Sequence, residues 1–368
     1  MSGPKYTNLV AGLPASVPFV SPDTQERLRG APYKARLGAN ENGFGPSPKA
    51  IKAIQDAASD VWMYGDELSF DLRQALAEKY DIGPDNIIVG EGIDGLLGNL
   101  VRLLVEPGVN VVTSVGAYPT FNYHVNAFGG EIHAVPYKDD FEDLDGLAAK
   151  ARETRPALVY LANPDNPMAS WHDGAAISAF LDQLPDDTLL CLDEAYVEFA
   201  PQDSVLEMDV TDPRLIRFRT FSKAYGLAGL RTGYGMATPE LISAFNKIRN
   251  HFGVNRLGQA AALAALQDQD WLAQTLNKVG AAKKRIAGIA VENGMTALPS
   301  ATNFVTIDTG HDADYAKAIV KSCDDQDVFI RMPFAAPQNR CLRVSAGPAE
   351  EIELFADALA VAVKQNGS

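Results

Sequence analysis

The sequence contains little cysteine and little histidine, which limits the metal and redox chemistry it can support. Only three cysteines and five histidines occur among 368 residues. Cys191, Cys323 and Cys341 lie in or beside apolar stretches, at spacings that suit neither a disulfide framework nor a metal site. We therefore expect buried free thiols in a reducing compartment, and no bound metal.

The sequence also lacks a long apolar segment and an excess of positive charge. No run approaches the roughly 20 apolar residues that a membrane-spanning helix needs, and Met1 to Lys5 lack the apolar core of a signal peptide. The formal net charge of −15 argues against a nucleic-acid partner, which normally needs a basic surface. These absences predict a cytoplasmic protein that binds neither nucleic acid nor membranes.

Apolar strand-like runs alternate with helical patterns through the middle of the chain. The expected strands are 87–89, 111–112, 157–161, 189–192 and 215–218. Because these runs are apolar without alternation and helical patterns separate them, they predict an α/β fold. Its sheet is expected to be mostly parallel and covered by helices on both faces.

Changes in composition and in the pattern of expected elements divide the chain into three parts. Residues 1–38 are rich in proline and glycine and are expected to form an N-terminal arm, while 39–248 form the large α/β domain. Residues 249–368 are expected to form a smaller α+β domain. Its expected elements are a helical stretch at 259–290, strands at 303–307, 328–330 and 341–344, and a final helix at 349–364.

Lys223 is the residue whose surroundings indicate a chemistry most clearly. It lies between Thr220 and Arg231, just after an apolar run and just before a glycine-rich turn. An amine in such a place can form a Schiff base with an aldehyde. The neighbouring hydroxyl of Ser222 and the guanidinium of Arg231 are groups that bind phosphate. This combination is what pyridoxal phosphate requires of a protein.

Asp193 supplies the acid that the same cofactor needs at its ring nitrogen. It ends the apolar run 189–192, and open parallel sheets bind ligands at the carboxyl ends of their strands. A carboxylate there can keep a pyridine nitrogen protonated, which makes the ring an electron sink. Tyr196, three residues later, is positioned to contact the ring hydroxyl. Taken alone, Asp193 reads equally well as a helix cap.

The segment Gly90 to Gly95 has the spacing G-x-G-x-x-G and follows a strand, so a nicotinamide or flavin site is an alternative. The acidic residue expected about twenty positions later is missing, since the next strand ends Val112-Thr113-Ser114. The same glycines allow backbone amides to approach a cofactor phosphate at a helix N-terminus. A tight turn without a ligand is the other interpretation.

Five motifs together resemble one enzyme family. They are Asn40-Glu41-Asn42 with Gly45-Pro46-Ser47-Pro48, Asn163 to Pro167, Asp193-Glu194-Ala195-Tyr196, Ser222-Lys223 with Gly229-Leu230-Arg231, and Leu342-Arg343-Val344. From about Ala39 to Gly347, the chain resembles the fold-type I, pyridoxal-phosphate-dependent aminotransferases, most closely those that act on histidinol phosphate. The resemblance implies a seven-stranded large domain, a homodimer, and two substrates: an amino donor and a 2-oxo acid such as 2-oxoglutarate.

The resemblance also implies a role for individual residues. Lys223 would carry the cofactor, Asp193 would pair with its ring nitrogen, and Tyr118 would stack on its ring. Asn166 and Tyr196 would contact the ring hydroxyl. The phosphate would be bound by Gly92, Ile93, Asp94, Thr220, Ser222, Arg231 and, from the neighbouring subunit, Tyr64. The substrate would meet Arg343 at its carboxylate, Arg331 at its far end, and Asn42, Phe19 and Phe252 elsewhere.

Some positions depart from the family pattern and leave the substrate open. Phe19 and Phe252 stand where some histidinol-phosphate enzymes carry tyrosine, which makes the pocket drier and favours an aromatic amino donor. A decarboxylase or lyase acting on a phosphorylated amino acid is a further alternative within the fold. Arg343 at the carboxylate position favours retention of the carboxylate and hence transamination. A non-catalytic relative would be expected to lose Lys223 or Asp193, and both are present.

Overall fold

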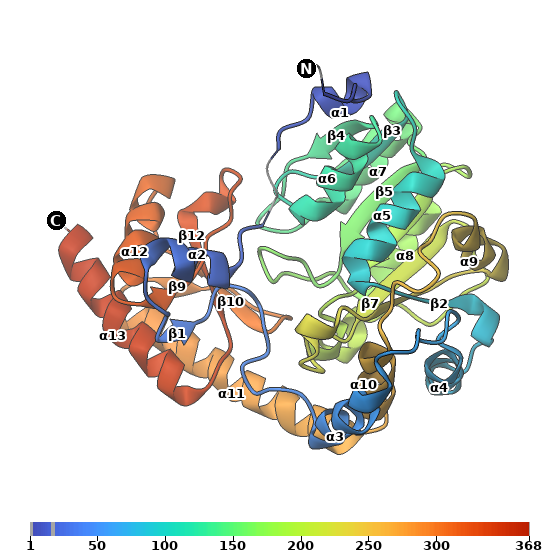
Figure 1. The fold of residues 1–368 in the computed structure, drawn as a ribbon. Coiled ribbons are helices and arrows are strands. Elements are labelled where there is room, and N and C mark those ends of the chain that lie inside the picture. Colours follow the sequence, from blue (N-terminus) through green and yellow to red (C-terminus); the bar gives the residue numbers. More distant parts are fainter. Residues whose placement is uncertain (1–2, 16–18, 368) are drawn as a thin grey trace.

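The computed structural model describes residues 3–15 and 19–367, which form an α/β fold with helices around two larger sheets (Figure 1). The helices are α1 Asn8–Ala11, α2 Pro22–Arg29, α3 Pro48–Ala57, α4 Phe70–Tyr80, α5 Gly92–Leu104, α6 Pro119–Ala127, α7 Leu144–Thr154, α8 Gly174–Asp182, α9 Pro239–Ala244, α10 Arg256–Leu266, α11 Gln269–Glu292, α12 Ala313–Asp325 and α13 Ala349–Asn366. Within the described residues, no helix has the length and apolar character needed to cross a membrane.

The strands form a seven-stranded sheet, a three-stranded sheet and a short pair. They are β1 Ala35–Arg36, β2 Ile87–Gly90, β3 Asn110–Ser114, β4 Glu131–Val135, β5 Leu158–Ala162, β6 Leu189–Asp193, β7 Leu215–Thr220, β8 Gly233–Met236, β9 Thr296–Ala297, β10 Phe304–Asp308, β11 Val328–Phe329 and β12 Cys341–Ser345.

The large sheet confirms the predicted fold class. Its strand order is β2-β8-β7-β6-β5-β3-β4, and the neighbours from β7 to β4 are parallel. Strand β8 is antiparallel to both of its neighbours, β7 and β2. Strand β8 was not predicted from the sequence, because two of its four residues are glycine and glycine is uncommon in strands. Nor was β4, an edge strand whose residues are mostly partly exposed.

Helices cover both faces of this sheet, as the apolar strands require. Helices α5 and α6 pack on one face through a cluster that includes Leu96 and Phe121. Helices α7 and α8 pack on the other face through a cluster that includes Leu147 and Phe180. Strands buried on both sides have no need of alternating polar residues, which explains the continuous apolar runs in the sequence.

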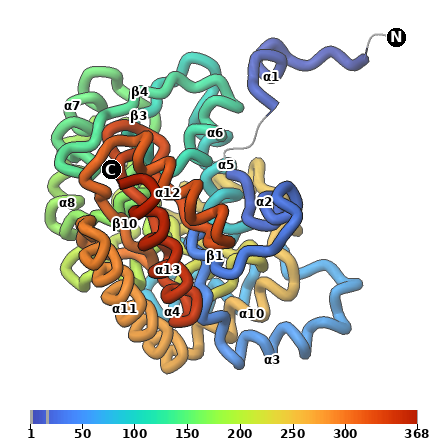
Figure 2. The backbone as a smooth tube through the Cα atoms, turned by 90° about the vertical axis from the view of Figure 1, so that its left-hand side faces the viewer, coloured from blue at the N-terminus to red at the C-terminus, as the bar shows by residue number. Residues whose placement is uncertain are grey.

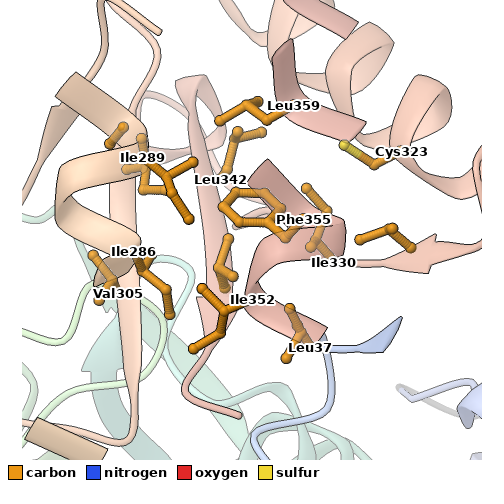
Figure 3. Close-up of a cluster of buried hydrophobic side chains, with 14 of the residues drawn as sticks. Leu37, Ile286, Ile289, Val305, Cys323, Ile330, Leu342, Ile352, Phe355 and Leu359 are labelled. Carbon is orange, nitrogen blue, oxygen red and sulfur yellow. The ribbon is translucent and has the colours of Figure 1, made fainter. Parts of the chain in front are cut away.

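A second core lies around the antiparallel sheet β12-β10-β9 and helices α11, α12 and α13 (Figure 2). The N-terminal segment contributes to it: β1 pairs with β11, and Leu37 lies among Ile352, Phe355 and other apolar side chains (Figure 3). Arg29 reinforces this attachment through an ion pair with Asp327 at 2.6 Å. The arm therefore reaches the C-terminal part of the chain.

The packing of helix α10 bears on where the chain divides into domains. The expected helical stretch 259–290 is two helices, α10 and α11, which are separated at Gln267 and Asp268. Helix α10 packs with α3 and α4 against the large sheet, whereas most buried residues of α11 belong to the C-terminal core. The division into 1–38, 39–248 and 249–368 stays a prediction. The hydrophobic clusters group the residues differently, because Ala35 and Leu37 pack in the C-terminal core and α10 packs on the large sheet.

Six strands of the large sheet point their carboxyl ends toward the same edge. Strands β3, β4, β5, β6 and β7 are mutually parallel, and β2 has the same direction because β8 is antiparallel to both β2 and β7. Asp193 is the last residue of β6, and the segments that follow β2, β3, β5 and β7 carry Gly92, Tyr118, Asn166 and Lys223. In an open α/β sheet this edge is where ligands bind.

The turn after Lys223 depends on a glycine at position 226. Gly226 has φ of +71°, and a Cβ there would lie 2.8 Å from both the carbonyl carbon and oxygen of Gly45. We predict that Gly226→Ala lowers the free energy of unfolding by about 2 kcal/mol or more, because backbone cannot yield as a side chain can.

The matched control for Gly226→Ala is Gly229→Ala in the same turn, where a Cβ would meet nothing within 4 Å. Urea denaturation followed by fluorescence should find this second variant within about 0.5 kcal/mol of wild type. Equal losses of stability in the two variants would contradict the steric explanation.

Candidate active site

A cavity of about 740 Å³ lies at the carboxyl edge of the large sheet, beside strand β12. It brings together most of the site residues expected from the sequence. These are Phe19, Ile93, Asp94, Tyr118, Asn166, Asp193, Tyr196, Thr220, Ser222, Lys223, Arg231, Arg331 and Arg343. Residues that lie up to about three hundred positions apart in the sequence therefore line one cavity.

Lys223 lies on the turn that follows strand β7, with its amine inside the cavity wall. Its Nζ donates to the backbone oxygen of Asn40 at 3.2 Å and lies 5.6 Å from the centre of the Tyr196 ring. Burial, and then the charges of Arg343 and Arg231, lower the pKa of Lys223 to about 8. A useful fraction of the amine is therefore neutral, and nucleophilic, near neutral pH.

Asp193 lies at the end of β6 and is 5% exposed. Its Oδ2 accepts a hydrogen bond from the hydroxyl of Tyr160 at 2.7 Å, and its Oδ1 accepts one from the amide of Ala195 at 3.0 Å. Burial raises the pKa of Asp193 to about 6, although these two hydrogen bonds oppose the shift. A carboxylate with this environment binds a cationic ring nitrogen favourably, because the cation removes the cost of burying a lone charge.

An anion site is formed where helix α5 begins. Gly92 has φ of +74°, and a Cβ there would lie only 2.6 Å from Nη2 of Arg231, so only glycine leaves this space open. Thr220 donates to the Ser222 hydroxyl at 3.0 Å, and Nη1 of Arg231 lies 3.5 Å from the same hydroxyl oxygen. Two hydroxyls, a guanidinium and the N-terminus of a 13-residue helix suit a phosphate group.

Tyr118 and Asp94 are linked at the rim of this anion site. The Tyr118 hydroxyl donates to Oδ1 of Asp94 at 2.8 Å, and Oδ2 of Asp94 lies 3.9 Å from Nη2 of Arg231. The hydrogen bond fixes the orientation of the Tyr118 ring. Burial and the Asp94 charge raise the pKa of the Tyr118 hydroxyl. A ring held in this way offers a flat apolar surface to a planar ligand.

Two arginines form the opposite wall of the cavity. Nη1 of Arg343 donates to Oδ1 of Asn166 at 2.5 Å, and its Nη2 donates to the backbone oxygen of Gly38 at 3.2 Å. Its Nε has no partner among the described residues. Arg331 stacks on Phe19 with 4.0 Å between Cζ and the ring centre, and burial followed by the Arg343 charge lowers its pKa to about 10.

Four residues expected in the site do not line the cavity of a single chain: Gly92 of the anion site, and Tyr64, Phe252 and Asn42. Tyr64 and Phe252 are 77% and 48% exposed, and their ring centres are 4.7 Å apart. Nδ2 of Asn42 donates to the backbone oxygen of Ala224 at 3.0 Å. Asn42 therefore stabilises the turn that carries Lys223 without lining the cavity. Asn40 lines the cavity instead, where its Nδ2 donates to the hydroxyl of Tyr196 at 2.9 Å.

Asn40, Tyr160 and Asn303 are residues that the sequence analysis did not identify. Nδ2 of Asn303 donates to the same Asn40 carbonyl oxygen that accepts from Lys223, at 3.1 Å. Tyr160 lies inside an apolar strand, where a tyrosine reads as core. The strand register could have indicated its role. Ala162 pairs with Asp193 in the sheet, so Tyr160, two residues earlier on the neighbouring strand, lies close enough for its hydroxyl to reach Asp193.

The topology rules out the dinucleotide interpretation of Gly90 to Gly95. A dinucleotide fingerprint belongs to a parallel βαβ unit, in which the first strand pairs with the next one. Strand β2 pairs instead with β8, and the two are antiparallel. The glycines therefore remain available for the phosphate site alone.

A partly buried lysine, an acid at a strand end and an anion site at a helix N-terminus define an enzyme that binds a phosphorylated aldehyde cofactor. The family model for aminotransferase class I and II matches residues 33–359. The chain therefore belongs to the class I and II aminotransferases and is a pyridoxal-phosphate-dependent transaminase.

Individual relatives agree with this assignment. The chain is 35% identical over 328 residues to histidinol-phosphate aminotransferase 2 of Pseudomonas fluorescens, which covers 88% of each protein. It is 35% identical over 361 residues to histidinol-phosphate aminotransferase 1 of Nitrosococcus oceani, which covers 97% of this chain and 96% of the relative. The histidinol-phosphate aminotransferase of Sinorhizobium meliloti in complex with pyridoxal-5'-phosphate is 51% identical over 99% of each chain, with a TM-score of 0.96.

The lowered pKa of Lys223 leads to a prediction for cofactor uptake. Only the neutral amine attacks an aldehyde, so the rate at which cofactor-free protein takes up pyridoxal phosphate should rise with pH. It should level off above the pKa of about 8. Stopped-flow absorbance would measure this rate. Lys223→Ala should bind the cofactor without the slow absorbance change, and a wild-type rate that is constant between about pH 6 and pH 9 would contradict the assignment.

Proposed function

We propose that this chain transfers the amino group of histidinol phosphate to a 2-oxo acid such as 2-oxoglutarate, a step of histidine biosynthesis. The observation that carries the proposal is the 51% identity over 99% of the chain to the Sinorhizobium meliloti enzyme. The cavity supports it chemically, because Arg343 and Arg331 provide cationic groups suited to the phosphate of histidinol phosphate and to the carboxylates of the 2-oxo acid.

The cavity has groups that fit each part of pyridoxal phosphate. Gly92, Ser222 and Arg231 would hold its phosphate, Tyr118 its ring face, and Asp193 its ring nitrogen. Tyr196 and Asn166 would contact the ring hydroxyl. When bound, the cofactor supplies an electron sink for the electrons of a Cα–H bond.

Lys223 has two tasks in the proposed mechanism. It would hold the cofactor at rest, and its free amine would then take the proton from the substrate Cα and serve as the group that donates it later. A pKa lowered to about 8 suits a base that accepts and donates near neutral pH. Tyr196 and the Asn40 carbonyl keep this amine within the cavity.

Arg343 has a guanidinium that suits the carboxylate of the 2-oxo acid, because two parallel hydrogen bonds match the carboxylate geometry. Histidinol phosphate carries a phosphate ester where an amino acid has its carboxylate, so its Cα has no carboxyl group to lose. The bond from Cα to hydrogen is therefore the one that breaks, which favours transamination over decarboxylation. The unpartnered Nε of Arg343 is a free donor for the carboxylate of the 2-oxo acid among the described residues.

An aromatic amino donor is the second candidate, and Phe19 is the observation that favours it. Phe19 lines the cavity and stacks on Arg331, so part of the far wall is apolar. Phe252 does not line the cavity of one chain, which leaves its role in the pocket a prediction for the dimer.

A comparison of donors tests the substrate. We predict that kcat/KM for histidinol phosphate exceeds that for phenylalanine by more than about a hundredfold, and that Arg331→Ala removes most of this margin. The same substitution should change the phenylalanine value by less than about threefold, because that donor carries no phosphate. Efficient turnover of phenylalanine with inactive histidinol phosphate would reject the proposed substrate.

We further infer that the enzyme is a cytoplasmic homodimer. The segment 61–64 and the neighbouring Phe252 form an exposed apolar surface, on which Trp62 is 80% and Tyr64 is 77% exposed. An apolar surface of this kind is typical of a subunit interface. The three cysteines are free and buried, which supports a reducing compartment.

A pair of inactive variants tests whether Tyr64 acts across the dimer. Lys223→Ala and Tyr64→Ala should each have little activity. If Tyr64 serves the neighbouring site, a heterodimer of the two has one intact site and should recover about half of the wild-type activity. The heterodimer can be purified through two different tags, with each homodimer as control. Recovery of none of the activity, or an active monomer in light scattering, would contradict the inference.

A further inference from the structure

Two carboxyl groups are buried together beneath the loop that carries Asn166. Glu142, in the segment before helix α7, is 1% exposed, and Asp165, within the loop itself, is 2% exposed. Neither belongs to the site residues described above. Carboxyl groups are rarely buried this completely unless a cation or several donors compensate for the loss of water.

Glu142 ties together the ends of two strands below the cavity. Its Oε2 accepts from the hydroxyl of Ser114 at the end of β3 at 2.5 Å, and its Oε1 accepts from the amide of Ala162 at the end of β5 at 2.9 Å. Its backbone oxygen lies 2.8 Å from Nε2 of His172. The residue therefore contacts both strand ends from which the Tyr118 and Asn166 segments begin.

Asp165 holds the Asn166 loop in its bent form. Its Oδ1 accepts from the hydroxyl of Tyr137 at 2.9 Å, and its Oδ2 accepts from the amide of Met168 at 2.9 Å. Backbone hydrogen bonds between Asp165 and both Ser170 and Ala169 close the same turn. The turn sets the position of Asn166, whose Oδ1 accepts from Arg343.

Among the described residues, neither carboxylate forms an ion pair. The charged or titratable groups that face the two are Tyr137, His172, Asp193 and, at longer range, Arg343. Burial, and then the mutual charge repulsion, raise the pKa of Glu142 well above its ordinary range, and burial raises the pKa of Asp165 to about 7. Two like charges this deeply buried are both ionised only at a high cost in free energy.

We propose that Glu142 and Asp165 act together as positioning residues for Asn166. Their hydrogen bonds to both strand ends and to the turn fix the loop. Through Asn166 the pair orients Arg343 toward the carboxylate of the 2-oxo acid. This inference rests on the proposed transamination, in which Arg343 binds that carboxylate.

Glu142→Gln and Glu142→Ala separate positioning from simple stability. Glutamine keeps an acceptor and resembles the protonated carboxyl, whereas alanine leaves the Ser114 hydroxyl and the Ala162 amide without a partner. We expect Glu142→Ala to raise KM for the 2-oxo acid about tenfold with a smaller change in kcat, and Glu142→Gln to restore KM to within about threefold. The matched control is Leu147→Ala, a fully buried truncation in helix α7 that should lower stability with KM unchanged.

Thermal unfolding of the cofactor-free protein provides a readout that is independent of activity. A carboxyl whose pKa is raised by folding binds more protons in the folded state, so its contribution to stability is lost as pH rises toward the raised pKa. Glu142→Gln cannot titrate. Its Tm relative to wild type should therefore increase between about pH 5 and pH 8.

Two results would overturn the inference. One is a Tm difference between Glu142→Gln and wild type that does not change with pH, which would mean that Glu142 is not the buried carboxyl that fixes the loop. The other is a KM for the 2-oxo acid in Glu142→Ala equal to that in Leu147→Ala, which would make the pair structural only. If the donor comparison rejects histidinol phosphate, the KM test for the 2-oxo acid is made with the donor that is turned over, and the Tm test is unaffected.

Discussion

Three cationic side chains that line the cavity form no ion pair among the described residues. They are Lys223, Arg331 and Arg343, and burial lowers the pKa of each. Cations held in this state destabilise the fold, because they lose water and gain no opposite charge. An anionic ligand reverses this cost, so binding and stability are linked. The rest of the architecture keeps these charges in place.

The two arginines are held near each other by backbone and not by their side chains. The amide of Arg343 donates to the oxygen of Arg331 at 2.6 Å, and the reverse bond is 3.2 Å. Strand β12, which carries Arg343, is in turn paired with β10 in the C-terminal sheet. The C-terminal sheet therefore determines the spacing of the two arginines, while the large sheet determines the positions of Lys223 and Asp193. The site is formed where the two meet.

The sequence predicted the strands and helices that are apolar and long, together with the residues at the strand ends. Lys223 and Asp193 could be found because a parallel sheet directs its carboxyl ends to one edge. Strand β8 could not, since its glycines carry no strand preference and its direction depends on β7 and β2. Asn40 and Asn42 are both asparagines in a turn-rich segment, and only the fold decides which of them faces the cavity.

The attachment of the N-terminal segment has a consequence for how the chain is made. Strand β1 pairs Ala35 with Val328, so residues made early wait for a partner nearly three hundred positions later in the chain. Asn40 and Gly38, which contact Lys223 and Arg343, lie just beyond this strand. The large sheet can assemble before Val328 is synthesised, whereas the binding pocket is completed only once β1 and β11 have paired. Closing so long a loop is slow, and until it closes the chain has no competent pocket to offer the cofactor.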